Sequence, residues 1–347
     1  MAAYTTIDDP TLHFQVQLYT GNGSADNAIT LDGDTDMQPD VVWIKNRDQA
    51  DSHCLFNTLY GATVAKNIEG SSTASADADT LDAFQSDGFK VDADVKVNTN
   101  TEAYVAYCWK MGTTSGLAGS PSITMVDYSF NQTAGQSIVQ WTGTDANGTV
   151  AHGLGALPHW SWIPFEGGSV YHHKNTSAPE TDILYTNTTA ATDDRINWWN
   201  DTAPTTDLTT VGNSSQVNGS GGDIVMYSFT SIQGYSKFGG YTGNGNADGA
   251  FAYTGFRPAF IIIKRSDGVD NWWLHDNKRG GYNGNNSVLY TNTNAAESAS
   301  ISVHLLSNGF KIRTTDVGYN ASGGAYIFMA WAESPFVNSE GVPATAR

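Results

Sequence analysis

The same short sequences recur in the same order in three parts of the chain. Residues 19–23 (YTGNG) return as residues 241–245, and residues 141–144 (WTGT) form a degenerate copy between them. A proline-led apolar run follows each copy, beginning at Pro39, Pro158 and Pro258. An aromatic-rich run closes each repeat, at residues 104–109, 224–229 and 326–331. A repeat of this kind fixes the architecture before any single motif does, and it divides the chain into units of roughly 100 to 120 residues.

We name these unit 1 (residues 1–115), unit 2 (116–232, the degenerate copy) and unit 3 (233–347). Each unit is long enough to bury a core of its own without a metal or a disulfide. The composition of 36 Gly, 16 Tyr, 14 Phe and 10 Trp with 15% charged residues favours pleated strands joined by many turns. The short apolar runs end at Gly, Asn or Thr, and several Asn-Gly pairs suit tight hairpin turns. We therefore expect an all-β protein of three tandem antiparallel β-sandwiches, of the jelly-roll kind, in a row.

Charge and hydropathy exclude two kinds of partner. The chain has 17 Lys and Arg against 35 Asp and Glu, a formal net charge of −18, and no basic stretch. Because nucleic-acid affinity comes largely from neutralised phosphates, DNA or RNA binding is not expected. No apolar run reaches the roughly 18 residues of a membrane span, and the first residues lack the features of an export signal.

Cys54 and Cys108 both lie in unit 1, and we expect two reduced thiols that face the core.

Sequence stretches in all three units carry a resemblance to a known family. They are residues 9–23, 38–47, 152–156, 234–239, 255–258 and 330–336. Together they resemble a family of structural proteins from tailed bacteriophages that is abundant in marine phages. The resemblance implies a virion protein, tail-fibre-like or capsid-decorating, with concanavalin-like or jelly-roll sandwiches. It supplies no catalytic motif.

Such a protein would be assembled in the host cytoplasm and exposed on the released particle, which explains the missing export signal. The resemblance also implies a homotrimer in contact with other phage structural proteins, since fibre proteins commonly form trimers of closed symmetry. Within the virion, a tail-fibre or tail-associated binder and a capsid decoration or head-fibre protein remain as alternatives. A bacterial lectin or adhesin is a further alternative, but it would need export.

Two tryptophan pairs with polar neighbours are the candidate ligand site. Trp198 and Trp199 form one pair, and Trp272 and Trp273 form the other, with His275 and Asp276 close behind. A flat indole beside amides and carboxylates suits a sugar, which has an apolar face and a rim of hydroxyl groups. If the pairs lie on strands, one tryptophan of each pair faces the core and the other faces outward. The outward member is then the candidate contact for a glycan or for another subunit.

Two metal sites are conceivable. Asp32, Asp34 and Asp36 place three carboxylates at alternate positions, as at the start of a calcium loop. Against calcium, Met37 stands where such a loop has glycine, and no glutamate follows at the required spacing. Histidines gather in unit 2 and could suggest zinc, but no cysteine accompanies them, and neighbours on a strand point to opposite faces: His152, His159, His172 and His173. An ordinary solvated turn and buried histidines are the competing interpretations.

An enzyme is the less favoured class. Glycoside hydrolysis needs two opposed carboxyl groups on a rigid scaffold, whereas the acidic residues here lie mostly in Gly-, Ser- and Thr-rich turns such as residues 75–79. Neither a nucleophile-elbow motif nor a zinc-protease motif occurs. Repetition of a whole unit also suits a scaffold or a multivalent binder better than a single active site. We therefore expect a non-enzymatic virion surface protein with host-glycan or receptor binding.

Overall fold

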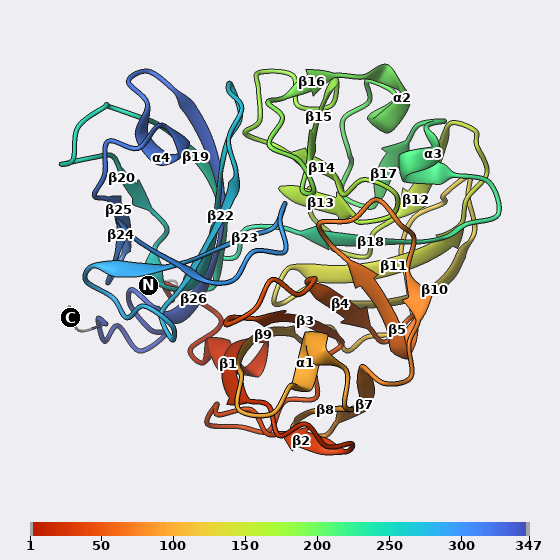
Figure 1. Ribbon diagram of the computed structural model, residues 1–347. Helices are drawn as coiled ribbons and strands as arrows, with labels where there is room; N and C mark the ends of the chain where they lie inside the picture. The colour runs from red at the N-terminus through yellow and green to blue at the C-terminus, as the bar shows by residue number, and fades with distance from the viewer. Residues whose placement is uncertain (1–2, 345–347) are drawn as a thin grey trace.

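The computed structural model describes residues 3–344, without the side chains of residues 285, 286, 300 and 301. It confirms the all-β class, since all strand pairs are antiparallel and the helices are single turns (Figure 1). Each of the three large sheets takes its strands from one continuous stretch of the chain. These stretches fall within units 1, 2 and 3, while the status of the units as separate domains stays a prediction.

Unit 1 pairs a six-stranded sheet, in the order β1-β9-β3-β4-β5-β6, with a three-stranded sheet, β2-β8-β7. The core between the two sheets includes Val42 and Phe56 from the large sheet and Leu81 and Phe89 from the small one. Unit 1 is thus a β-sandwich. Its elements are η1 (Pro10–Leu12), β1 (Phe14–Thr20), β2 (Asn27–Ile29), β3 (Val41–Asn46), β4 (Cys54–Asn57), β5 (Gly61–Asn67), β6 (Ser75–Ala76), β7 (Leu81–Gln85), β8 (Gly88–Val91), α1 (Val95–Asn98) and β9 (Ala103–Trp109).

Unit 2 has a seven-stranded sheet, β10-β11-β18-β13-β14-β15-β16, and a two-stranded sheet, β12-β17. Its own core lies between them, around Trp141, Ile163 and Val211. Its elements are β10 (Met125–Asn131), β11 (Gln136–Thr142), β12 (Gly148–Ala151), β13 (Trp160–Ile163), β14 (Ser169–His172), β15 (Asp182–Tyr185), β16 (Asp193–Asp194), α2 (Ile196–Trp199), β17 (Leu208–Val211), α3 (Ser215–Asn218) and β18 (Asp223–Phe229).

Unit 3 forms one continuous eight-stranded arrangement, β19-β26-β21-β22-β23-β24-β25-β20, that folds over its own core around Ile263, Phe310 and Phe328. Strand β20 therefore lies at an edge. The elements are β19 (Ser236–Thr242), β20 (Phe251–Tyr253), β21 (Phe256–Arg265), β22 (Trp272–Asp276), β23 (Asn285–Tyr290), β24 (Ser298–Leu306), β25 (Gly309–Ile312), α4 (Val317–Asn320) and β26 (Ala325–Pro335).

The glycines of the repeated sequences lie where two backbones touch. A Cβ atom on Gly21, Gly143 or Gly243 would stand 2.1, 1.9 or 2.2 Å from a carbonyl oxygen of the loop before the closing strand. A contact this short between a Cβ atom and a backbone oxygen is not tolerated, so only glycine fits. Gly88 and Gly309 obey the same rule, at 2.0 and 2.1 Å from the carbonyl oxygens of Ile29 and Ala252. The repeat therefore preserves backbone contacts.

A buried asparagine at the end of a one-turn helix fixes the same loop in each unit. Asn98, Asn218 and Asn320 end α1, α3 and α4, and all are buried. The Asn320 side chain accepts from the Asn244 backbone N–H at 2.8 Å and donates to the Asn246 carbonyl at 2.7 Å. Asn98 and Asn218 make the corresponding bonds with residues 22–24 and 144–146. These bonds satisfy buried polar groups that would otherwise destabilise the loop.

The closing strand of each unit is apolar on both faces. In β9, Val105, Tyr107 and Trp109 face one way, and Tyr104, Ala106 and Cys108 face the core of unit 1. Strands β18 and β26 alternate in the same manner. Because successive side chains of a strand point to opposite faces, each large sheet has an apolar surface on both faces, and both must pack against another layer.

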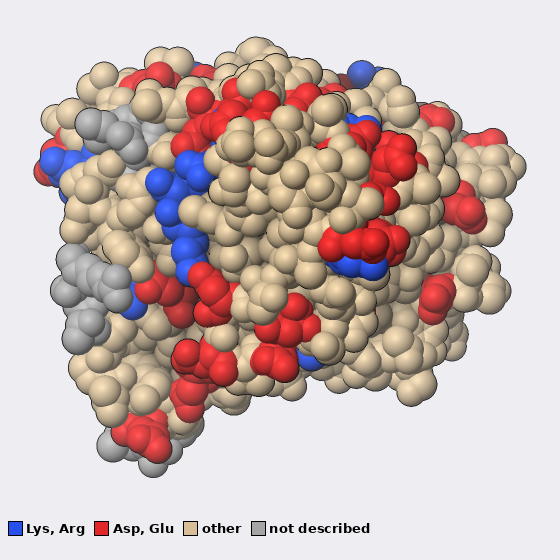
Figure 2. Space-filling model, turned by 60° about the horizontal axis from the view of Figure 1, so that its bottom comes forward, with Lys and Arg blue, Asp and Glu red and all other residues tan. Residues whose placement is uncertain are grey.

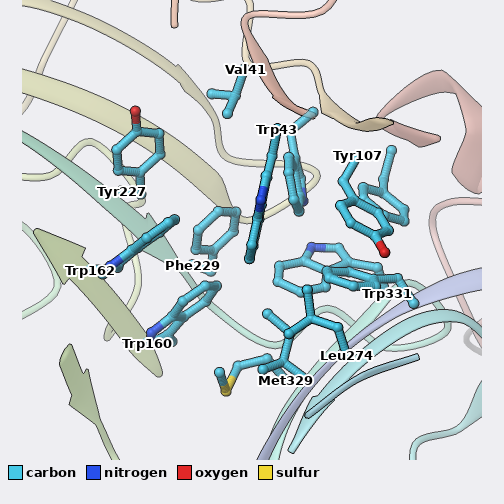
Figure 3. Packing of buried hydrophobic residues seen from close by; sticks show 14 of the residues in the cluster. Val41, Trp43, Tyr107, Trp160, Trp162, Tyr227, Phe229, Leu274, Met329 and Trp331 are labelled. Atoms are coloured by element: carbon cyan, nitrogen blue, oxygen red, sulfur yellow. The ribbon is translucent and has the colours of Figure 1, made fainter. Parts of the chain in front are cut away.

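The second layer is shared by all three units. Phe14 and Trp109 of unit 1, Trp160 and Phe229 of unit 2, and Trp331 of unit 3 belong to one cluster, which we call the central core. Figure 3 shows its tryptophans, tyrosines and aliphatic side chains pointing toward one another from three directions. The sandwiches therefore do not lie in a row as expected: the units surround a common centre, because each large sheet has an apolar outer face that the other two units cover.

Three equivalent polar residues link the units in cyclic order. Each of them is the last residue of a strand and pairs with a residue at the matching position of its sheet. The pairs are Asn57 of β4 with Val41, His172 of β14 with Trp160, and Asp276 of β22 with Phe260. The Asn57 amide donates to the Tyr227 hydroxyl of unit 2 at 2.8 Å.

His172 of unit 2 lies with Nε2 3.3 Å from the Phe328 carbonyl of unit 3. Tyr107 of unit 1 donates to the Asp276 carboxylate of unit 3 at 3.0 Å. Unit 1 thus contacts unit 2, unit 2 contacts unit 3, and unit 3 contacts unit 1, so the arrangement has approximate threefold character.

The segment before β1 crosses from unit 3 to unit 1. The Thr5 hydroxyl donates to the Gln233 carbonyl at 2.8 Å, and the Tyr4 hydroxyl donates to the Gly255 carbonyl at 3.0 Å. Asp8 accepts a bond from the Ser339 backbone N–H at 2.6 Å. The first and last described segments therefore lie together against unit 3, as Figure 1 shows.

The two cysteines are free and buried in the core of unit 1, as expected. Burial raises the pKa of both thiols well above the ordinary value, so they stay protonated at neutral pH. Within residues 3–344, no helix has the length and hydropathy needed to cross a membrane.

Candidate functional site

The tryptophans proposed from the sequence as ligand contacts are buried. Trp198 and Trp199 lie on the short helix α2, not on a strand, and both pack in the core of unit 2. The Trp198 indole donates to the Ser169 hydroxyl at 3.0 Å. The expectation of one outward tryptophan is therefore wrong for this pair, because a single helical turn directs both side chains onto the sandwich.

Trp272 and Trp273 do lie on a strand, β22, and face opposite sides of it. Trp272 is in the central core, where its indole donates to the Tyr185 carbonyl of unit 2 at 2.8 Å. Trp273 packs on Tyr319 in the core of unit 3, with a ring-centroid distance of 4.4 Å. Both faces of the strand are covered, so neither tryptophan reaches solvent to stack on a sugar. The prediction that the two side chains point to opposite faces of the strand was correct, but the prediction that one of them is exposed to solvent was not.

His275 and Asp276 belong to the interior as well. His275 Nε2 lies 2.7 Å from the Tyr319 hydroxyl, and both residues are fully buried. Asp276 forms an ion pair with Arg279 at 2.5 Å and also receives the bond from Tyr107. The neighbouring carboxylates Asp276 and Glu297 keep the pKa of Arg279 above its ordinary value in spite of burial. This is a buried ionic network that holds units 3 and 1 together.

The aspartates proposed for calcium form an exposed turn. Asp32, Asp34 and Asp36 are all exposed, and Asp32 pairs with Lys278 of unit 3 at 2.7 Å. Among residues 3–344, no group of three or more His, Cys, Asp or Glu side chains is placed to hold a metal ion. The predicted calcium loop is thus not formed, because the three carboxylates do not gather into one group of potential ligands.

Three of the four histidines considered for zinc do gather. The rings of His159 and His173 are 4.4 Å apart, and those of His172 and His173 are 5.3 Å apart. His152 lies elsewhere, beside the Thr205 carbonyl. Burial lowers the pKa of His173 to about 4, helped by His159 and by Lys174 and Lys237, and it lowers the pKa of His159 and His172 too. The trio lies at the boundary of units 2 and 3 and is neutral at pH 7.

Two grooves follow boundaries between units. One, of about 230 Å³, lies between units 1 and 3 and is lined in part by Asp32, Asp34, Lys278 and Glu333. The other, of about 450 Å³, lies between units 1 and 2 and includes Tyr60, Phe165 and Asp223. The Tyr60 hydroxyl of unit 1 donates to the Asp223 carbonyl of unit 2 at 2.6 Å, so it already makes a contact between the two units.

A third groove, of about 280 Å³, lies where the first described segment crosses unit 3. We call it the tyrosine groove, and its lining includes Tyr4, Ser231, Gln233, Lys237, Tyr253 and Thr254. The hydroxyls of Tyr4 and Tyr253 are 3.0 Å apart. Sequence reasoning missed this groove because Tyr4 is separated by more than 200 positions from the other lining residues, which lie between residues 231 and 255. The alternation of Phe251 and Tyr253 was a usable signal for exposed aromatic rings.

These features define an all-β protein in which antiparallel sandwiches share one aromatic core, with polar groups lining the three grooves described above. The chain belongs to the family described as a domain of unknown function, DUF7483, whose model matches residues 9–335. That match spans all three units, so the family is defined by the whole arrangement and not by one sandwich. No match was found among curated proteins or among solved structures.

Proposed function

We propose that the protein is a non-catalytic structural protein on the surface of a tailed-phage particle, tail-associated, with a role in binding host glycan or another receptor. The observation that supports a structural role is the packing of the central core. Side chains from all three units fill it, and two cavities within it measure only about 10 Å³ each. An interior packed this densely, with buried polar links at each unit boundary, suits a rigid component that must survive outside a cell.

The placement of the titratable groups favours a non-catalytic role. The buried carboxylate Asp276 is neutralised by Arg279, and His275 is held by Tyr319. Such side chains are already engaged in folding contacts, whereas a general acid or base must be free to exchange a proton with a substrate. The phage assignment itself rests on the resemblance of the sequence stretches in all three units.

Immunogold electron microscopy of purified particles tests this proposal. An antibody against the purified protein should label intact particles at the tail, and serum from before immunisation should not. Regular label over the head would favour the alternative, a capsid decoration or head-fibre protein. Recovery of the protein only in the particle-free lysate would overturn the proposal.

The homotrimer also stays a proposal. The three units already bury against one another the aromatic faces that a trimer of single units would bury. A trimer of the full chain must therefore use other surfaces. Light scattering of the purified protein distinguishes three copies from one chain of 37.2 kDa.

A further inference from the structure

The tyrosine groove combines the rings of Tyr4 and Tyr253 with polar groups. Tyr253 is 53% exposed on the edge strand β20, and Phe251, on the same face of that strand but outside the lining of the groove, is 44% exposed. Exposed aromatic rings on one face of an edge strand are unusual, because such rings normally contribute to a core or an interface. Here Ala252, between them, is the residue that faces inward.

Tyr4 completes one wall of the groove. Its hydroxyl is fixed by the Gly255 carbonyl and by Tyr253, so the ring has a defined position. Burial raises the pKa of Tyr4 to about 12, with the Tyr253 bond as the second cause, so the Tyr4 phenol is a neutral donor and acceptor at pH 7. Ser231, Gln233 and Thr254 add hydroxyl and amide groups to the lining. This combination matches a sugar ring, which offers an apolar face and a rim of hydroxyls.

The charge of the groove selects among sugars. Its lining contains Lys237 and no carboxylate, in a chain of net charge −18. Lys237 forms no salt bridge with any residue of the described part of the chain, and it is close enough to His159 and His173 to lower the pKa of both imidazoles. Lys174 contributes in the same direction.

On the face shown in Figure 2, acidic side chains are spread widely and basic ones occur in a few small groups. The groove between units 1 and 3 has Asp32, Asp34 and Glu333 against a single lysine. An anion is therefore favoured at the tyrosine groove and disfavoured at that other groove.

We propose that the tyrosine groove binds an anionic saccharide, with the sugar ring against Tyr253 and its carboxylate or sulfate at Lys237. This inference rests on the proposed receptor-binding function and names its ligand class. Contact with a partly exposed lysine is worth up to about fivefold in affinity, so the charge adds selectivity to contacts that the ring and the hydroxyls already supply.

Binding assays on the full chain test it with matched probes. Tri-galacturonate is compared with its methyl ester, which keeps the rings and loses the charge, and a sulfated carrageenan tetrasaccharide is compared with the neutral agarose tetrasaccharide. Saturation-transfer NMR and calorimetry should show the anionic member of at least one pair binding about fivefold more tightly at low salt, with the difference shrinking as salt is added. The pair that discriminates tells whether a carboxylate or a sulfate is preferred.

Variants separate the role of the lysine charge from the role of the tyrosine ring. Lys237→Gln should abolish the preference for the anionic probe, and Lys278→Gln, in the groove between units 1 and 3, should leave it unchanged. Tyr253→Ala should weaken binding of both members of a pair, whereas Tyr253→Phe keeps the ring and should retain most of the affinity.

Equal binding of anionic and neutral probes, no binding of any of them, or an unchanged preference in Lys237→Gln would overturn the inference. Because these assays use purified protein, they can fail while immunogold still places the protein on the particle, and the reverse also holds.

Discussion

At the scale of single residues, one position of the repeat shows how different side chains serve the same purpose. Asn57, His172 and Asp276 each accept backbone N–H groups of the turn that follows and reach the next unit with their other polar atom. Unit 3 has Met329 at the strand position where units 1 and 2 have Tyr107 and Tyr227. His172 therefore bonds the Phe328 backbone carbonyl instead of a tyrosine hydroxyl. The position needs a short polar side chain with two bonding atoms, and three residue types provide it.

Replacing Asp276 tests the ionic network. Asp276→Ala leaves the Arg279 guanidinium, which is 0% exposed, without its closest partner. A buried charge that loses its partner costs roughly 3–5 kcal/mol, so urea unfolding should show a loss of that size. The control is Asp267→Ala, which removes the more exposed pair with Arg265 and should cost less than about 1 kcal/mol. Similar losses for the two variants would contradict this account.

At the scale of elements, the one-turn helices act as supports for the repeated loops. Asn320→Ala removes side-chain bonds to Asn244, Asn246 and Thr314. We expect a loss of roughly 2–4 kcal/mol in the free energy of unfolding, with faster hydrogen exchange at Gly243 and Gly245. Asn147→Ala, at an exposed site, should cost less than about 0.5 kcal/mol. A stable Asn320→Ala protein with an unchanged loop would refute the role of the helix end.

The buried histidines of unit 2 should make stability depend on pH. In the unfolded chain a histidine takes up a proton near pH 6.5, but burial holds the pKa of His173 and His152 at about 4 in the folded protein. The unfolded state therefore binds more protons between about pH 6.5 and pH 4, and stability falls as the pH drops through that window.

Melting temperatures measured from pH 7.5 to 4 check this dependence. His173→Gln should make the curve flatter, because it removes one of the groups that resist protonation. His304→Gln should change the curve less, since its side chain is only partly covered. A flat curve for the wild-type protein would show that these imidazoles are not buried in solution.

Much of the element pattern could be predicted from the sequence. The closing runs, the Asn-Gly turns and the repeated glycines indicate strands and hairpins, and these features arise from local backbone geometry. The central core could not be found in this way, because a strand such as β9 that is apolar on both faces gives the same signal whether its second face meets a sheet of its own sandwich or a neighbouring unit. Trp272 was misplaced for the same reason, since it looks like a surface residue until two other units cover it. Trp198 and Trp199 were misplaced because they lie on the helix α2 and not on a strand.

At the scale of the whole molecule, the central core should make the three units unfold together. Trp331 lies within 6 Å, between ring centroids, of aromatic rings from all three units, including Phe14, Phe229 and Phe260. Trp331→Ala should lower the free energy of unfolding by roughly 3–5 kcal/mol. Val269→Ala, at a side chain that is 71% exposed, should have almost no effect.

Calorimetry provides the readout for both variants. The wild-type protein and Trp331→Ala should each give one transition, with calorimetric and van't Hoff enthalpies in agreement. Three resolved transitions, only one of which moves in Trp331→Ala, would mean that the units are energetically independent and that the shared core adds little.

The contact between the segments at residues 4–8 and 336–339 has a consequence for how the chain can be connected. Tyr4 lies beside Phe336, with ring centroids 6.4 Å apart, and Asp8 bonds Ser339. A short peptide could therefore join the two segments, and new ends could be opened in the largely exposed stretch at residues 113–122. Such a circular permutant would begin with unit 2 and end with unit 1, yet every boundary between units would be unchanged. The unit with which the gene begins would then be open to change, while the cyclic order of the three units would not.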